Sequence, residues 1–146
     1  MMPKEFGFYL TQGVVNRCSK DRDRAEFLIN ESNTSFEGLI ERMDKIGIND
    51  KNANSIIKDC YDIMMELIRA KLFLEGYKAS GQHAHEAEVS FLMEIKFLPA
   101  DVSFLNEIRH FRNSITYYGK ILDAEYATKV FEFMRQIRPK IIKTIR

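Results

Sequence analysis

Proline, glycine and cysteine are scarce in this sequence, since its 146 residues include 3 Pro, 7 Gly and 2 Cys. Few prolines and glycines argue against a loop-rich or all-β design, because the turns of such folds depend on these residues. The two cysteines, Cys18 and Cys60, lie in unrelated segments without the spacing of a metal site, so we interpret them as reduced thiols. No run of 18 apolar residues is present, so we expect no membrane-spanning helix and no membrane partner.

Targeting and catalytic signatures are missing as well. Residues 1–5 lack the apolar segment of a signal peptide, from which we expect a cytoplasmic protein. The sequence contains no Gly-rich phosphate loop, no Gly-x-Ser-x-Gly, no His-Glu-x-x-His and no Cys-x-x-Cys. Their absence argues against the classes of enzyme that depend on these motifs, and we expect no cofactor.

The composition that remains is typical of one globular domain, with 45% apolar and 29% charged residues. We therefore assign residues 1–146 to a single domain. The net charge of +1 is unevenly distributed, because nine Lys and Arg against three acidic residues from Arg109 onward give +6 and leave −5 for the preceding part. This basic C-terminal part has three interpretations. It binds an anionic partner, it attracts the acidic part of the same protein, or its lysines are simply solvated.

Apolar residues recur at helical spacing almost throughout, and no segment alternates apolar with polar residues, so we expect helices and no strands. The helix over residues 52–77 is apolar on more than one face, which is typical of the middle of a bundle. The fold class is therefore all-α, an antiparallel up-and-down bundle of four to five helices, with residues 1–20 forming a short N-terminal helix packed on it. The pattern places helices at about 6–15, 21–46, 52–77, 85–97, 100–118 and 123–145.

Single residues predict where some helices begin and end. Asp21 and Asp123 are suited to cap helix N-termini, while Gly119 is suited to end a helix. Pro139 predicts a kink or an interruption in the last helix, because it lacks the backbone N–H that a helix needs. Steps of four and three residues predict the packing face of the helix over 21–46. This face comprises Ala25, Ile29, Ser32, Phe36, Leu39, Met43 and Ile46.

The residues most suited to chemistry are concentrated between residues 108 and 119. Arg109 and Arg112 are three positions apart and share a helix face, so together they suit a phosphate or an RNA backbone, or alternatively pair with the acidic part of the protein. On a straight helix Arg112 and Tyr117 point about 140° apart, and they converge only if the helix loosens or a second subunit supplies one of them. The candidate binding residues are Arg109, His110, Arg112 and Tyr118, and the candidate catalytic residues are Arg112, Asn113 and Tyr117.

Two histidines, His83 and His85, stand at alternate positions just before a predicted helix. This is a poor geometry for two metal ligands without a third, so we predict no metal site. We interpret His85 as a residue that caps or orients the start of its helix.

Carboxylates form a second group of candidates, on the helix over residues 52–77. Asp62 and Glu66 are four positions apart and share a face with the nearby Asp59. An acid/base pair is one interpretation of these carboxylates. A surface stripe paired with Arg69 or Lys58 is another, and a buried salt bridge to Arg112 is a third.

The sequence RNSITYYG at residues 112–119, near the start of the last long helix, resembles the motif of the HEPN family. Further similarity lies in NANS at 52–55, in AKLFLEGY at 70–77, and in HEA at 85–87 followed by VSFL at 89–92. The resemblance covers roughly residues 20–140. It implies a small helical bundle of a kind that is common in bacteria and archaea and is often encoded beside a minimal nucleotidyltransferase.

The resemblance also shows a departure from the family's nuclease pattern. Members that cleave RNA without metal carry an Arg that holds phosphate and, four to six residues later, a His that helps to activate the 2′-hydroxyl. Here the Arg corresponds to Arg112 and the next polar residue to Asn113, but Tyr117 stands at the histidine position. A phenol with a pKa near 10 is a poor general base at neutral pH.

Together these features imply a HEPN-type module that binds nucleic acid or a nucleotide and works with an MNT-type nucleotidyltransferase in a toxin–antitoxin-like system. The resemblance further implies a homodimer, because dimers of this family bring two copies of the Arg-bearing motif to one cleft. One alternative is a metal-independent endoribonuclease, a toxin, in which Tyr117 or His110 replaces the usual base. Another is a purely structural or interaction protein, with Arg112 bound to a carboxylate of the helix over 52–77.

Overall fold

The computed structural model describes residues 1–119 and 121–145, and their side chains except at 116–118. Over these ranges the chain is mostly helical, as the apolar spacing predicts, and none of its helices combines the length and apolar character needed to cross a bilayer. The elements are α1 (Phe6–Thr11), β1 (Val15–Arg17), α2 (Arg22–Lys45), α3 (Ala53–Glu75), β2 (Tyr77–Ala79), α4 (Ala84–Glu94), α5 (Pro99–Tyr118) and α6 (Ala124–Ile145).

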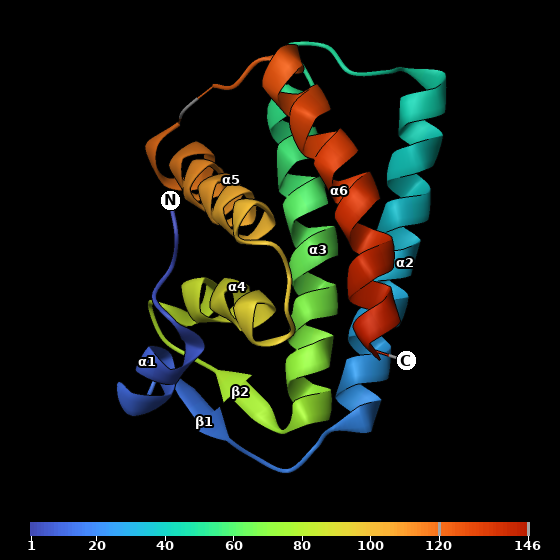
Figure 1. The fold of residues 1–146 in the computed structure, drawn as a ribbon. Helices are drawn as coiled ribbons and strands as arrows, with labels where there is room; N and C mark the ends of the chain where they lie inside the picture. Colours follow the sequence, from blue (N-terminus) through green and yellow to red (C-terminus); the bar gives the residue numbers. More distant parts are fainter. Residues whose placement is uncertain (120, 146) are drawn as a thin grey trace.

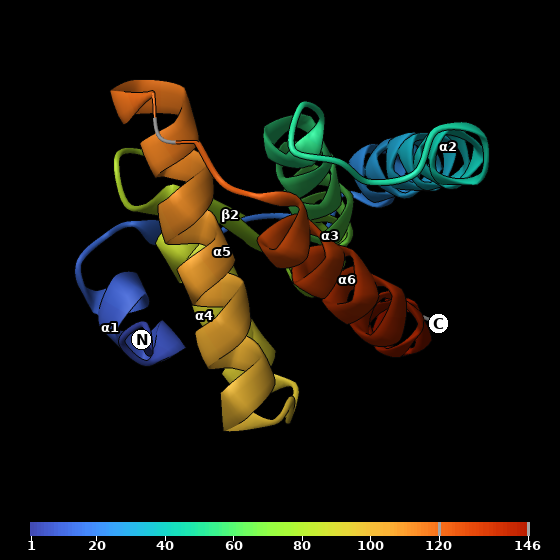
Figure 2. The same cartoon turned by 90° about the horizontal axis from the view of Figure 1, so that it is seen from above.

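Helix α3 occupies the centre of the fold (Figures 1 and 2). Helices α2 and α6 pack along it, while α4 and α5 cross it from another side. Its apolar side chains, including Ile57, Met64 and Leu67, are buried around most of the helix. The prediction that residues 52–77 form the middle of the bundle is therefore confirmed.

Helices α3 and α6 run in the same direction, which departs from the predicted up-and-down arrangement. The backbone N–H of Leu122, just before α6, donates to Oδ1 of Asn54 in the first turn of α3, at 2.9 Å. At the other ends of the two helices, Nζ of Lys71 donates to the carbonyl oxygen of Thr144 at 2.8 Å. The physical reason is that α4 and α5 lie across the bundle and carry the chain back to the end where α3 begins (Figure 1).

Strands β1 and β2 form an antiparallel pair, so the expectation of no strands is wrong here. Val15 lies opposite Ala79 in the register. Each strand has only three residues, which is too short for an alternating pattern to be visible in the sequence. The pair holds α1 beside α4, where the ring centroids of Phe6 and Phe91 are 4.9 Å apart. The predicted N-terminal helix is therefore shorter, because α1 ends at Thr11.

The predicted helix ends are largely confirmed. Asp21 and Asp123 each accept a hydrogen bond from the backbone N–H three residues later, at 3.0 and 2.9 Å. Gly119 ends α5 with a left-handed φ of 66°, a conformation that favours glycine. Pro139 does not interrupt α6, which continues to Ile145. Ile46 was predicted to pack on the bundle but is exposed, because α2 ends one residue before it.

Candidate functional site

A groove of about 670 Å³ follows the exposed face of α3 between α2 and α5. Figure 2 shows that α2 packs along α3 while α5 crosses it at an angle, and the residues that line the groove come from these three helices and from α4. A volume of this size is within the range of small-ligand sites. The charged side chains along it come from four helices and include Arg42, Asp59, Asp62, Glu66, His85 and Arg112.

A stripe of carboxylates, formed by Asp59, Asp62 and Glu66, lies along the floor of the groove. Partial burial raises the pKa of Asp62, and the nearby guanidinium of Arg112 offsets only part of this effect. Burial also raises the pKa of Glu66, and the negative charge of Asp62 adds to the increase. Asp59 is instead ion-paired with Arg42 of α2. Asp62 and Glu66 therefore remain available as acceptors for hydrogen-bond donors in the groove.

Arg112 reaches the groove from α5 and forms no hydrogen bond to a carboxylate among the described residues. Its Nη2 lies 3.9 Å from Oδ1 of Asp62, which is beyond hydrogen-bond distance. Its Cζ is 5.8 Å from the centre of the Tyr61 ring, a distance that permits a cation–π contact. The side chain is 28% exposed, and its Nε is buried without a hydrogen-bond partner in the described part of the chain. One of the three interpretations of the carboxylates, a buried salt bridge to Arg112, thus differs from what the described residues show, because Asp62 lies only at ion-pair distance and its side chain is 53% exposed.

Tyr61 lies under the Arg112 guanidinium and lines the same groove. The residue is only 3% exposed, and its hydroxyl finds no hydrogen-bond partner among the residues that the structure describes. Burial raises the phenol's pKa above its ordinary value, so the hydroxyl stays protonated at neutral pH. A buried donor of this kind is costly unless a partner is supplied.

At the α4 side of the groove, His85 and Arg69 both bind the buried carboxylate of Glu88. Nε and Nη2 of Arg69 donate to the two oxygens of Glu88 at 2.7 and 3.0 Å. Nδ1 of His85 lies 2.9 Å from Oε1 of the same carboxylate. Burial opposes the ionisation of Glu88, but the hydrogen bonds from His85 and Arg69 outweigh it and lower the pKa.

The pairing of His85 with Glu88 sets the chemistry of the imidazole. In the tautomer in which Nδ1 donates to Glu88, Nε2 is an acceptor; Nη2 of Arg69 lies 3.3 Å from the same Nδ1. The i, i+3 spacing of the two residues is visible in the sequence, but the interpretation of His85 as a residue that caps or orients the start of its helix does not include this pairing with Glu88. Arg69 is contributed by another helix and could not be assigned to this cluster from spacing.

The predicted site residues do not all face this groove. Arg112 lines it, whereas Arg109 turns back along α5 and donates from Nε to Oδ1 of Asn106 at 2.9 Å. His110 is exposed and its ring packs edge-on against the ring of Phe111. Asn113 is half-buried and is not part of the groove lining.

The predicted tyrosines Tyr117 and Tyr118 have side chains outside the described part of the structure. His83 and His85 contact different carboxylates, since Nδ1 of His83 is 3.5 Å from Glu86. Among the described residues, no three or more His, Cys, Asp or Glu side chains gather as a metal site would require. The charged and titratable groups that can contact a ligand in the groove are therefore its arginines, its carboxylates and His85.

Comparisons with protein-family models, with curated proteins and with solved structures found no match to this chain. The function of the groove is therefore inferred from its own residues.

Proposed function

We propose that this protein is a HEPN-type module that binds RNA or a nucleotide, with one phosphate held at Arg112 in the groove. The observation that carries the proposal is the difference between Arg112 and the other two arginines of the groove. Arg42 is ion-paired with Asp59, and Arg69 is bound by both oxygens of Glu88. Arg112 alone of these three retains a guanidinium without a hydrogen-bonded carboxylate. Guanidinium groups bind phosphate through paired, charge-assisted hydrogen bonds.

The carboxylates of the groove fit the same class of ligand. Nucleotides carry hydroxyl and amino donors as well as phosphate, and Asp62 and Glu66 supply the matching acceptors. A ligand with phosphate alone would meet repulsion from this stripe. The groove thus favours a ligand that is anionic at one end and rich in hydrogen-bond donors at the other.

A binding experiment with Arg112→Ala tests this proposal. We would measure the fluorescence anisotropy of a labelled single-stranded RNA of twelve nucleotides. Loss of one charge-assisted contact corresponds to about 1.5–3 kcal/mol, so we expect the Kd to rise roughly 10- to 150-fold. Arg135→Ala is a matched control, because Arg135 also lies over an aromatic ring, that of Phe131 at 5.7 Å, but on α6 and away from the groove.

A purely structural role for Arg112 predicts a different result. In that case Arg112→Ala lowers the melting temperature substantially and leaves the affinity for RNA unchanged. Equal affinity of the Arg112→Ala variant, the Arg135→Ala variant and the original protein would therefore refute phosphate binding at Arg112.

A second candidate function is metal-independent cleavage of RNA, and the hydrogen bond between His85 and Glu88 favours it. His85 would act as the general base in place of Tyr117, whose phenol is poorly suited to that role. Its Nε2 would take the proton of a 2′-hydroxyl while that oxygen attacks the phosphorus of the phosphate held at Arg112. The 5′-oxygen leaves and takes a proton from water. We expect cleavage in EDTA to be lost in His85→Ala and retained in His83→Ala, whose histidine is also exposed. An intact RNA after incubation with the original protein would exclude this candidate.

The resemblance to HEPN proteins also supports two proposals about partners. A homodimer would bring a second copy of residues 109–113 toward the groove, and light scattering of the purified protein measures its mass. An MNT-type nucleotidyltransferase encoded beside this protein would be the second partner. Co-purification of the two proteins after joint expression tests for it.

A further inference from the structure

A second, smaller pocket of about 270 Å³ lies between the start of α2 and strand β2. Figure 1 shows β2 directly after the end of α3 and near the start of α2. Three aromatic rings line this pocket, those of Phe27, Phe73 and Tyr77. Phe27 is 62% exposed, whereas Phe73 is buried and Tyr77 half-buried. The pocket therefore combines one exposed ring with two rings that are largely covered by their surroundings.

The charge of this pocket differs from that of the groove. Arg24, Arg69 and Lys78 line it, and the one carboxylate among its described lining residues is Glu88. Glu88 is 3% exposed and already binds Arg69 and His85. No free negative charge thus faces a ligand here, and the pocket is net positive.

Two of the three rings have a guanidinium beside them. Cζ of Arg24 lies 5.1 Å from the centre of the Phe73 ring. Arg17, which is not itself a lining residue, has its Cζ 5.3 Å from the Tyr77 ring, and its Nη1 donates to the Tyr77 hydroxyl at 3.2 Å. Aromatic side chains that alternate with cations are the combination that stacks unpaired bases while contacting the backbone beside them.

The pocket and the groove meet at one cluster of residues. Arg69 lines both of them. Glu88 lines the pocket, while its hydrogen-bond partner His85 lines the groove. The Arg69 side chain is therefore shared by the two sites, and its Nη1 is not used by Glu88.

We propose that this pocket, here called the base pocket and lined by Phe27, Phe73, Tyr77, Arg24 and Lys78, stacks an unpaired nucleobase of an RNA whose phosphate lies at Arg112. This inference rests on the proposed function and narrows the ligand to single-stranded RNA that spans both sites. A base that stacks on the exposed ring of Phe27 must leave its own stack, so a perfect duplex does not fit.

Fluorescence of a single-stranded RNA containing 2-aminopurine tests the proposal, because stacking on an aromatic ring quenches this base. We expect quenching on binding, and we expect Phe27→Ala to remove it. The Kd should rise about 5- to 150-fold in Phe27→Ala, the range for loss of one base–aromatic stack. A duplex of the same sequence should bind more weakly than the single strand.

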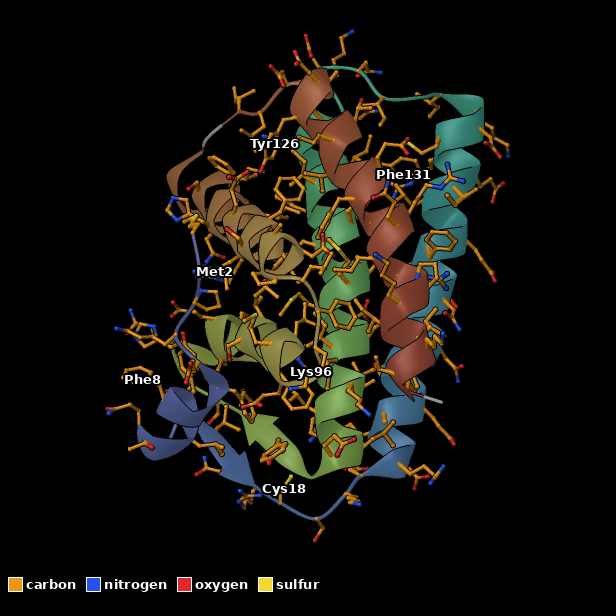
Figure 3. All side chains as sticks on the ribbon, in the orientation of Figure 1. Met2, Phe8, Cys18, Lys96, Tyr126 and Phe131 are labelled. Carbon is orange, nitrogen blue, oxygen red and sulfur yellow. The ribbon has the colours of Figure 1, made fainter. Side chains whose placement is uncertain are left out.

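Phe8→Ala provides the matched control. Phe8 is 43% exposed and has the ammonium of Lys4 5.4 Å from its ring, but it lies on α1, away from α2 (Figure 3). Its removal should leave both quenching and affinity unchanged. Phe27 is exposed, so its truncation should not prevent folding, and circular dichroism of both variants checks this.

The outcomes separate this inference from the proposed function. If Arg112→Ala weakens RNA binding but Phe27→Ala changes neither affinity nor quenching, the base pocket is wrong and phosphate binding at Arg112 stands. Equal binding of duplex and single strand would also overturn the base pocket. If the protein binds no RNA, or binds it independently of Arg112, the proposed function itself fails and the base pocket fails with it.

Discussion

Replacement of Glu88 by Gln should destabilise the protein more than any comparable change on the same helix. Glu88 is 3% exposed on α4 and holds two groups from different places in the sequence, Arg69 of α3 and His85 of α4. Gln keeps the size of the side chain and removes its charge. One of the two contacts to Arg69 is lost, because the Gln amide nitrogen donates and cannot accept from a guanidinium.

The magnitude follows from these contacts. Loss of one charge-assisted hydrogen bond and of the counter-charge for Arg69 would cost 3–5 kcal/mol at a fully buried site. The Arg69 side chain is 29% exposed, and water compensates part of the loss, so we expect about 2–3 kcal/mol. For a domain of this size, that corresponds to a fall in Tm of roughly 4–12 °C.

The pH dependence has a defined sign. The pKa of Glu88 is lowered in the folded protein below its ordinary value of 4.5. The stabilisation is therefore fully present above that value and is lost as the pH falls through the folded pKa. The contribution of the Glu88 charge to the difference in free energy of unfolding between the original protein and Glu88→Gln should shrink as the pH falls below 4.5 through the folded pKa.

Urea unfolding followed by circular dichroism at several pH values measures this difference. Glu86→Gln is the control, because Glu86 lies on the same helix with a histidine partner, His83, at 3.5 Å and is more exposed. Its effect should stay below about 0.5 kcal/mol. A Glu88→Gln variant as stable as Glu86→Gln, or a difference that grows as the pH falls below 4.5, would show that the Glu88 charge does not stabilise the fold.

Two further predictions concern stability. Tyr61→Phe should leave the free energy of unfolding unchanged or raise it by up to about 1 kcal/mol, because it removes a buried hydroxyl without a partner in the described residues. Urea unfolding measures this, and a loss of more than about 1 kcal/mol would mean that the hydroxyl has a hydrogen-bond partner. Gly76→Ala should cost more than Gly47→Ala, since both have φ near +80° but only the Cβ at Gly76 would meet a backbone oxygen, that of Cys18 at 2.9 Å. We expect about 1–2 kcal/mol for Gly47→Ala and more for Gly76→Ala, and equal melting temperatures would contradict this reasoning.

Much of the candidate site was beyond sequence reasoning, although its separate parts were visible. The carboxylates Asp62 and Glu66 and the cation Arg112 were recognised as chemically suited residues, and the structure brings Arg112 to the same groove as both. Arg109, His110 and Asn113 were predicted beside Arg112 but do not line the groove. The difference depends on how α5 is rotated against α3, which the apolar spacing of α5 defines only coarsely.

The cluster of Arg69, Glu88 and His85 shows a second limit. The spacing of His85 and Glu88 places them on one helix face, a local property of the sequence. Their contact with Arg69 depends on α4 packing against α3, because Arg69 and Glu88 are nineteen positions apart. A buried Glu is recognisable only when its partners are known.

The sequence by itself determined most of the helical segments, the starts of α2 and α6 directly after the capping residues Asp21 and Asp123, and the central place of α3. These properties depend on spacing within one segment and on capping groups a few residues away, so local physics is sufficient. Only the tertiary structure decided the β1–β2 pair, the parallel course of α3 and α6, and the two neighbouring pockets that share Arg69. Each of these joins residues distant in the sequence, and their contact energies depend on how whole helices pack rather than on any local pattern.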